Sequence, residues 1–444
     1  MKPSLSIPIY VFCILLASSC HKQFAEPDVI DHNAGAVTAD SPEYDFDYSI
    51  YEMGSIMIET VQRTPITNKD SYLDCTVNVD GGIFMGKYSG PARIRGRGNS
   101  TWGWYPKKPY RLKLNESTSL MGMHKNKDWV LLADYRDPTH MMNMCAFAMA
   151  HYLDMPFTNH YRYVRLTING EYLGLYMITE QIERAAHRVN VDKDEGYIFN
   201  LDLDDGPVGS PDSGDSFWSE VYATEVGIKY PEDPTQEQVD KARNEFAKME
   251  KAVLSNDWQL IQQHLDVRSA VHEMLIHEIT MNIDFCNNVS FHSVPIHKVD
   301  SNSPWAWGPV WDFDSGYSLD VNNHMRQGFF VEYKKLILGT DPFTGAAALR
   351  GKIPGILGDL FKLPEFVRLF KEIWSENKDG MLNYALSEID NIQKVIRDAA
   401  YEDYDIWGIS DYRDFDTQVA TMKLWLTKRF AYLDTIIPYY PERQ

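Results

Sequence analysis

The chain has 444 residues, of which 44% are hydrophobic and 24% are charged, a balance that is typical of globular proteins and excludes a disordered chain. Its formal charge of -20, from 43 basic and 63 acidic side chains, argues against a nucleic-acid-binding protein, because such binding depends on Lys and Arg. The length is that of about two or three domains, or of one large domain with insertions.

The first 20 residues have the features of a targeting segment. Lys2 is the only charge before an apolar stretch at residues 7–16, which is shorter than the roughly 20 residues of a membrane-spanning helix. The residues before Cys20 resemble the lipobox of bacterial lipoproteins, with Ala17 where that motif usually has Leu. We therefore expect a lipoprotein signal peptide at residues 1–20 with lipidation of Cys20. The alternative is a secretory signal that is cleaved nearby.

A polar, acidic and aperiodic segment follows at residues 21–45, as expected of a flexible tether. The folded domain is expected at residues 46–440. The protein should contact a membrane through the lipid anchor only and lie in the bacterial cell envelope outside the cytoplasm. The periplasm and the cell surface both remain open, as does the oligomeric state.

The domain begins with hydrophobic alternation that predicts strands at residues 55–60, 72–79 and 92–95. A glycine-rich turn follows the third of these strands. It contains Gly96, Gly98, Asn99 and Ser100. Because glycine lacks a Cβ, the backbone N–H groups of such a turn can approach an anion closely.

A basic strand comes next, at residues 110–114, where alternation puts Arg111 and Lys113 on one face. Lys108 stands just before this strand. A Gly-x-Gly pair alone usually marks only a turn, but together with the basic strand it predicts a phosphate clamp.

A helix is predicted at residues 138–153, with a proline at its first position. A hairpin follows at residues 162–178, since Asn169 and Gly170 favour a tight turn between two alternating strands. Glu180 stands just past the second strand of this hairpin.

The second half begins with a surface loop, predicted at residues 202–218 from its Gly, Pro and Asp content. Helical periodicity follows at residues 235–254 and 267–283. Asp284 comes directly after the second of these helices. The C-terminal part has helical spacing of its apolar residues and is interpreted as packing scaffold. Its predicted helices span residues 356–361, 364–378, 381–401 and 415–437.

Carboxylates also follow an apolar run at residues 309–311, which is interpreted as the end of a buried strand. Asp312 and Asp314 flank Phe313 there, and Gly316 follows. Oxygen ligands without Cys or His suit a hard cation such as Mg²⁺. The alternative for an isolated Asp-x-Asp is an acidic turn that caps a strand.

Four sequence blocks, taken in this order, are similar to the signature of the spore-coat protein H (CotH) kinase family. They lie at residues 95–113, 127–139, 168–182 and 308–314. The resemblance covers roughly residues 50–430. It implies an α+β protein with an atypical protein-kinase-like fold, in which the N-terminal lobe is mainly β and the C-terminal lobe mainly α. It also implies ATP-dependent phosphorylation of coat proteins.

The resemblance assigns roles to the acidic residues. In protein kinases a helix is followed by the catalytic Asp, an Asn, a short hairpin and a metal-binding Asp. Asp284 is accordingly expected to be catalytic, and Asp312, Asp314 and Asn288 (or Asn287) to bind Mg²⁺. The spacing from Asp284 to Asn288 is one residue shorter than in protein kinases, and the chain has neither H-R-D nor D-F-G.

The nucleotide-binding residues are expected in the first half. They are Gly96, Gly98, Asn99, Ser100, Lys108, Arg111, Lys113 and Glu180. Kinases usually pair a nucleotide-binding Lys with a Glu on the next helix. The predicted helix at residues 138–153 has no Glu, so the acidic partner is expected to be Glu180 or Asp137, and the lysine Lys113 or Lys108.

The sequence therefore predicts a Mg²⁺- and ATP-dependent protein kinase, whose partners are a nucleotide and a protein phosphoacceptor with Ser or Thr hydroxyls. One alternative is a non-catalytic (pseudokinase) lipoprotein for surface binding or assembly, with glycans as candidate ligands. The aromatic content of 13% favours it, as does the scarcity of ATP outside the cytoplasm. A third reading is a metal-dependent phosphohydrolase that uses the same aspartates.

Overall fold

The computed structural model describes residues 47, 49–202, 215–222, 224–287, 290–317, 330–338, 355–408 and 414–440, without the side chains of residues 286, 287 and 290. These residues all belong to one compact unit. The predicted signal peptide with Cys20 and the predicted tether at residues 21–45 lie outside the described residues, so both remain predictions.

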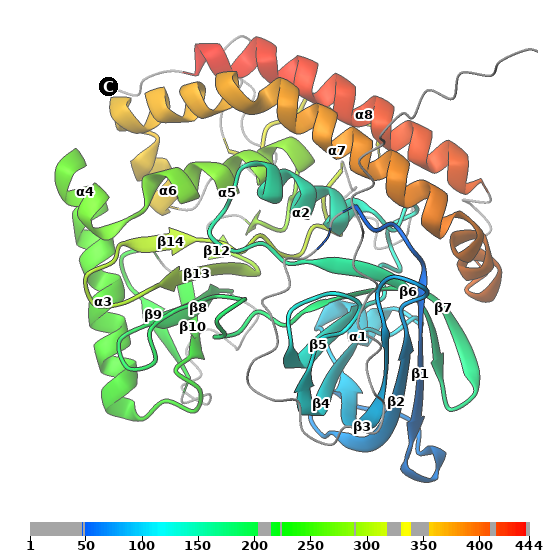
Figure 1. Cartoon of the computed structure of the whole chain (residues 1–444). Helices are drawn as coiled ribbons and strands as arrows, with labels where there is room; N and C mark the ends of the chain where they lie inside the picture. Colours follow the sequence, from blue (N-terminus) through cyan, green and yellow to red (C-terminus); the bar gives the residue numbers. More distant parts are fainter. Residues whose placement is uncertain are drawn as a thin grey trace, which may run out of the picture. The chain divides into compact units, whose positions relative to one another are not determined.

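The first seven strands form a closed barrel in the order β1-β2-β3-β4-β5-β7-β6, with β1 and β6 paired in parallel (Figure 1). Apolar residues alternate along these strands and fill the interior, for example Ile56, Val77, Ile94 and Leu112. The bounds are β1 Gly54–Thr60, β2 Leu73–Asp80, β3 Lys87–Gly96, β4 Tyr110–Thr118, β5 Asn126–Leu132, β6 Tyr161–Ile168 and β7 Glu171–Glu180. The predicted alternation is thereby confirmed for the first half.

Two short helical segments, η1 (Val61–Arg63) and α1 (Ser100–Trp104), connect barrel strands. The predicted hairpin is also present, as β6 and β7. Its turn residues Asn169 and Gly170 have φ angles of 54° and 85°, which explains why this pair stands there.

The helix α2 (Met142–Tyr152) begins later than predicted, so the proline is not in its first turn. The reason is the carboxylate of Asp137, which accepts hydrogen bonds from the backbone N–H groups of Thr139 at 2.7 Å and Met142 at 2.6 Å. These bonds hold the preceding residues in a turn and satisfy a donor at the helix start.

The second half contains a five-stranded antiparallel sheet in the order β14-β13-β8-β10-β9, in addition to the predicted helices. Its bounds are β8 Tyr197–Leu201, β9 Ser216–Ser219, β10 Thr224–Tyr230, β13 Val294–Lys298 and β14 Trp305–Trp307. A separate two-stranded hairpin consists of β11 (Cys286–Asn287) and β12 (Ser290–Phe291). Two predictions were wrong: residues 216–219 form a strand, and residues 309–311 do not.

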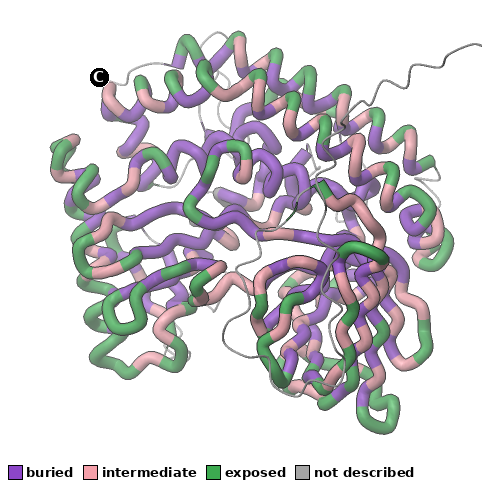
Figure 2. Tube along the Cα trace, viewed as in Figure 1, coloured by how far each residue is buried: buried purple, intermediate pink, exposed green. Residues whose placement is uncertain are grey.

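Helices surround this sheet (Figure 1). They are α3 Gln236–Leu254, α4 Trp258–His264, α5 Val267–Thr280, α6 Gly355–Leu360, α7 Pro364–Ile406 and α8 Phe415–Ile436, followed by η4 Ile437–Tyr439. Figure 2 shows that α2 and α5 are almost entirely buried, and the buried residues of α5 include Glu273, His277 and Glu278. None of the described helices is long and apolar enough to cross a membrane.

The helix α7 is one helix of 43 residues where two were predicted. Gly380 lies between the two predicted helices, and glycine disfavours a helix by about 1 kcal/mol relative to alanine. In the fold this glycine makes room for a neighbour: a Cβ at its position would lie 1.8 Å from the Tyr152 hydroxyl. Packing of α2 against α7 therefore explains the glycine inside an unbroken helix.

The helix α7 also joins the two halves. The ammonium group of Lys107, which is fully buried, lies 2.7 Å from the Asp403 carboxylate on α7 and donates to the Leu175 carbonyl at 2.5 Å. The same carboxylate accepts the backbone N–H of Leu175 at 3.0 Å. A buried charge pair with extra hydrogen bonds resists separation, so these contacts hold the barrel against the helices.

Candidate functional site

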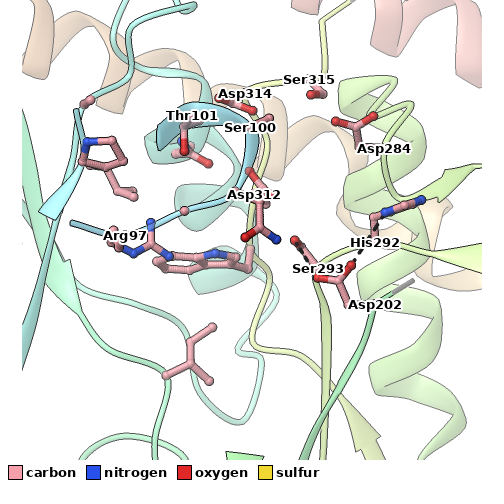
Figure 3. Close-up of a pocket in the computed structure, with 18 of the residues that line it drawn as sticks. Arg97, Ser100, Thr101, Asp202, Asp284, His292, Ser293, Asp312, Asp314 and Ser315 are labelled. Carbon is pink, nitrogen blue, oxygen red and sulfur yellow. Dashed lines mark hydrogen bonds and ion pairs between the residues drawn. The ribbon is translucent and has the colours of Figure 1, made fainter. Parts of the chain in front are cut away.

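A cavity of about 790 Å³ is lined by residues of the barrel and of the second sheet with its flanking segments. This volume is in the range of small-molecule sites. It is lined by seven of the predicted site residues: Gly98, Asn99, Ser100, Arg111, Asp284, Asp312 and Asp314. Figure 3 shows Asp312 in the middle, with Arg97 on one side and Ser293 and Asp202 on the other.

Asn282 connects the two segments that carry the catalytic and metal-binding candidates. It follows α5, which ends at Thr280. Its side-chain amide donates to the backbone carbonyl of Asp312 at 2.8 Å, and its carbonyl oxygen accepts the backbone N–H of Asp284 at 3.3 Å. One buried side chain therefore sets the spacing between Asp284 and Asp312.

His277 supports the same arrangement from α5. Its ring lies between Phe285 and Phe313, with centroid distances of 3.9 Å and 4.6 Å and nearly parallel planes. Asn282 also contacts its Nδ1 at 3.3 Å, and Glu273 lies 3.2 Å from its Nε2. Burial lowers the pKa of His277, so this ring stacks as a neutral imidazole.

Residues of α2 also form hydrogen bonds with the segment that follows β14. The backbone N–H of Phe313 donates to the side-chain oxygen of Asn143 at 2.9 Å. The Tyr317 hydroxyl donates to the Met142 carbonyl at 3.0 Å, and the Tyr317 N–H donates to the Thr280 carbonyl at 2.5 Å. Asp312 and Asp314 are therefore held by both α2 and α5, although no regular strand contains them.

The carboxylates of this cavity repel one another. Burial, together with the charges of Asp314 and Asp284, raises the pKa of Asp312 to about 7. The pKa of Asp314 is also raised, first by burial, while Arg136 opposes the change. Such a group of carboxylates holds excess negative charge that a bound cation relieves.

Arg97 and Arg136 are two of the three cavity-lining arginines that were not predicted, the third being Arg95. The Arg97 guanidinium lies 5.4 Å from the centroid of Trp311 and opposes the raised pKa of Asp312. Arg136 donates to the Ser315 hydroxyl at 3.2 Å. Their positions in the sequence offered a signal, because Arg97 stands between the two glycines of the predicted clamp and Arg136 lies within a CotH-like block.

A third unpredicted group closes the cavity on the side of the second sheet. The Asp202 carboxylate lies 3.5 Å from the Ser293 hydroxyl and 3.7 Å from Nδ1 of His292. The Ser293 side chain also lowers the pKa of Asp312, against the effect of burial. No sequence pattern links Asp202 to residues so far along the chain, so only the sheet pairing of β8 with β13 reveals this contact.

Four other predicted ligands that the structure describes, Gly96, Lys108, Lys113 and Glu180, do not line the cavity. Gly96 packs against Trp102, whose ring would lie 2.3 Å from an added Cβ. The Lys108 ammonium donates to the Trp102 carbonyl at 2.5 Å, and that of Lys113 lies 3.2 Å from Asp128. Glu180 accepts the backbone N–H of His160 at 2.6 Å and contacts its ring at 2.7 Å.

The nucleotide-binding roles of these four residues stay predictions. Among the described residues, no ion pair joins Glu180 to Lys108 or Lys113. The buried lysine beside them in the chain, Lys107, lines the cavity and pairs with Asp403. Asn288 lies outside the described residues, so its metal-binding role also stays a prediction.

In the described part of the chain, no three His, Cys, Asp or Glu side chains are grouped so that they could hold a metal ion by themselves. Magnesium at nucleotide sites is held by one or two carboxylates together with phosphate oxygens and water. Asp312 and Asp314 supply hard oxygen donors with excess negative charge, and they fit that mode of binding.

Replacing Asn282 with alanine should lower any phosphoryl transfer at this site by about tenfold to a hundredfold, because catalytic groups that move by about 1 Å lose that much rate. We expect kcat to fall while the dissociation constant for nucleotide changes little. Steady-state kinetics and calorimetry on Asn282→Ala test this. Asn302→Ala, in an exposed turn, is the control. Unchanged kcat in Asn282→Ala would contradict the positioning role.

Basic side chains on one wall of the cavity and carboxylates on the other are the kinds of group that phosphoryl transfer uses, the first for phosphate oxygens and the second for Mg²⁺ and the acceptor hydroxyl. A comparison with protein families agrees. The family model described as CotH kinase protein matches residues 94–433, so the chain belongs to the CotH kinase family. A search of curated proteins finds no match.

Proposed function

We propose that the chain is a Mg²⁺–ATP-dependent protein kinase, which transfers the γ-phosphate to Ser or Thr hydroxyls of a surface or coat protein. One observation carries the proposal. Asp284 and Asp312, which are far apart in sequence from the glycine turn, line one cavity with Gly98 and Arg111. Membership in the CotH kinase family supports a kinase-like activity.

The proposal also covers the fold. The barrel would correspond to the N-terminal lobe of an atypical protein kinase, and the second sheet with its helices to the C-terminal lobe. The cavity between these elements supports this correspondence, because kinases bind nucleotide between their lobes. The second half is not mainly α, as was predicted for the C-terminal lobe, because it also contains the five-stranded sheet of β8–β10, β13 and β14.

Each wall of the cavity has a role in the proposed reaction. Arg97 and Arg111, with the backbone of Gly98 and Asn99, would bind phosphate oxygens of ATP. Asp284 would accept the proton of the acceptor hydroxyl as its oxygen attacks the γ-phosphorus and the bond to ADP breaks. Asp312 and Asp314 would hold Mg²⁺, which neutralises phosphate charge when it is bound.

The location and partner of the enzyme are part of the proposal. A lipid on Cys20 and a tether at residues 21–45 would place the domain outside the cytoplasm at a membrane surface. The phosphoacceptor would then be a protein exposed at the same surface. The apolar stretch at residues 7–16 and the small residues before Cys20 support this location.

The test is transfer of ³²P from γ-labelled ATP to the chain itself and to added proteins such as casein, with and without Mg²⁺. We expect Mg²⁺-dependent label on Ser or Thr. Release of free phosphate without labelled protein would instead indicate a phosphohydrolase. If neither labelled protein nor free phosphate is formed, the result would favour the non-catalytic surface protein.

A further inference from the structure

Arg136 is a buried cation whose hydrogen bonding is incomplete. Its exposed fraction is 6%, and it lines the cavity. One guanidinium nitrogen, Nη1, donates to the Ser315 hydroxyl at 3.2 Å, but Nε has no hydrogen-bond partner. Among the residues that the structure describes, no carboxylate forms an ion pair with it. The guanidinium of this cavity-lining residue therefore retains donor capacity.

Tyr105 presents a second buried donor beside it. Its exposed fraction is also 6%, it lines the same cavity, and its hydroxyl has no hydrogen-bond partner. The Arg136 carbon Cζ lies 6.0 Å from the Tyr105 ring centroid. The rings of Tyr105 and Tyr135 stack with their centroids 5.4 Å apart. Burial raises the pKa of the Tyr105 phenol, so the group is a protonated donor at neutral pH.

Two unpartnered donors in one buried place need a physical reason. A buried donor without an acceptor is unfavourable, and more so when it carries a charge. The carboxylates of Asp314, Asp284 and Asp312 raise the pKa of Arg136 and keep it charged without forming ion pairs with it. A group that is both anionic and rich in acceptors would satisfy Arg136 and Tyr105 together.

We propose that Arg136 and Tyr105 form an anion subsite for a phosphoryl group, and that this group is the terminal phosphoryl of the bound nucleotide. The assignment to a nucleotide rests on the proposed function, whereas the affinity for a tetrahedral oxyanion does not. Three phosphate oxygens offer the acceptors that a fork of guanidinium N–H groups and a phenol can reach.

The position of the subsite explains its use. Arg97 and Arg111 belong to the barrel wall, whereas Arg136 lies near Asp314 and Asp284, the candidates for metal binding and proton transfer. A cation at that place binds the phosphoryl group while it passes to the acceptor, and such charge stabilisation speeds phosphoryl transfer. Sequence reasoning placed no basic residue on this wall.

The test is isothermal titration calorimetry of the full chain with orthophosphate, Mg–ADP and Mg–ATP. Arg136→Gln removes the charge. Tyr105→Phe removes only a hydroxyl, keeps the ring contact with Tyr135 and leaves no hole. The controls are Arg368→Gln, whose side chain is 60% exposed on α7, and Tyr439→Phe, which is 63% exposed. Melting temperatures confirm that each variant folds.

We expect both subsite variants, and neither control, to bind orthophosphate and Mg–ATP about tenfold or more weakly, with Mg–ADP affinity unchanged. Weaker orthophosphate binding in both variants would support the subsite even when the wild type binds no nucleotide, in which case only the kinase proposal fails. Wild-type orthophosphate and ATP affinity in both variants would overturn the subsite. Equal losses for ADP and ATP would overturn its assignment to the terminal phosphoryl group.

Discussion

Replacement of Asp312 with asparagine is expected to lower phosphate transfer from ATP by about a hundredfold or more, the usual effect of removing one preorganised electrostatic contact. The amide keeps the shape of the side chain but loses the charge that a hard cation requires. The backbone contact to Asn282 involves the Asp312 carbonyl and therefore remains. The measurement is the initial rate of ³²P transfer at saturating ATP and Mg²⁺.

The same substitution should not unfold the protein. Burial and the charges of Asp314 and Asp284 raise the pKa of Asp312, so removal of this carboxylate relieves repulsion. Without divalent cations we expect Asp312→Asn to melt at the wild-type temperature or above it. Asp398→Asn, whose side chain is 85% exposed, is the control and should retain full activity. Wild-type activity of Asp312→Asn would remove Asp312 from the reaction.

Replacement of Arg429 with methionine is expected to destabilise the fold by about 3–5 kcal/mol, the usual result of removing one partner of a buried ion pair. Arg429 and Glu278 are fully buried, with 2.6 Å between Nη2 and Oε1. Arg429 also donates to the carbonyls of Tyr333 and Lys335 at 2.7 Å. Its loss leaves the Glu278 charge and these acceptors unsatisfied where α8 packs on α5.

The measurement is the midpoint of thermal or urea unfolding, compared with that of Arg397→Met. Arg397 also joins two helices, since its guanidinium lies 2.7 Å from Asp416, but its side chain is 49% exposed. An exposed pair is screened by water and salt, so its loss should move the midpoint little. Equal shifts for both variants would show that burial of the Arg429–Glu278 pair does not set its strength.

Local signals in the sequence were enough for the elements whose patterns are short-range. Alternation located the barrel strands, Asn169 and Gly170 located the hairpin turn, and helical periodicity located α3, whose N-cap Thr235 forms a capping box with Gln238. The length of α7 was not predictable, because Gly380 stands there for contact with Tyr152, a residue far away in sequence.

More of the acidic candidates than of the basic candidates line the cavity. Asp284, Asp312 and Asp314 stand at ends of apolar segments, and such positions are visible in a single sequence. The environment of a basic side chain depends instead on its neighbours across the barrel. Lys113 faces Asp128 on the next strand, which alternation along one strand cannot reveal. Arg136 lies in a CotH-like block of the sequence, but the unpartnered Nε that makes it a candidate is visible only in the folded cavity.

Calorimetry of nucleotide binding tests the proposed site most directly. The full chain is titrated with ATP in Mg²⁺, in EDTA, and with Asp312→Asn in Mg²⁺. A Mg²⁺–ATP site predicts binding by the wild type in Mg²⁺, with much weaker binding in EDTA and in the variant. Absence of binding at millimolar ATP, or equal binding in all three titrations, would contradict a Mg²⁺–nucleotide site between the barrel and the second sheet.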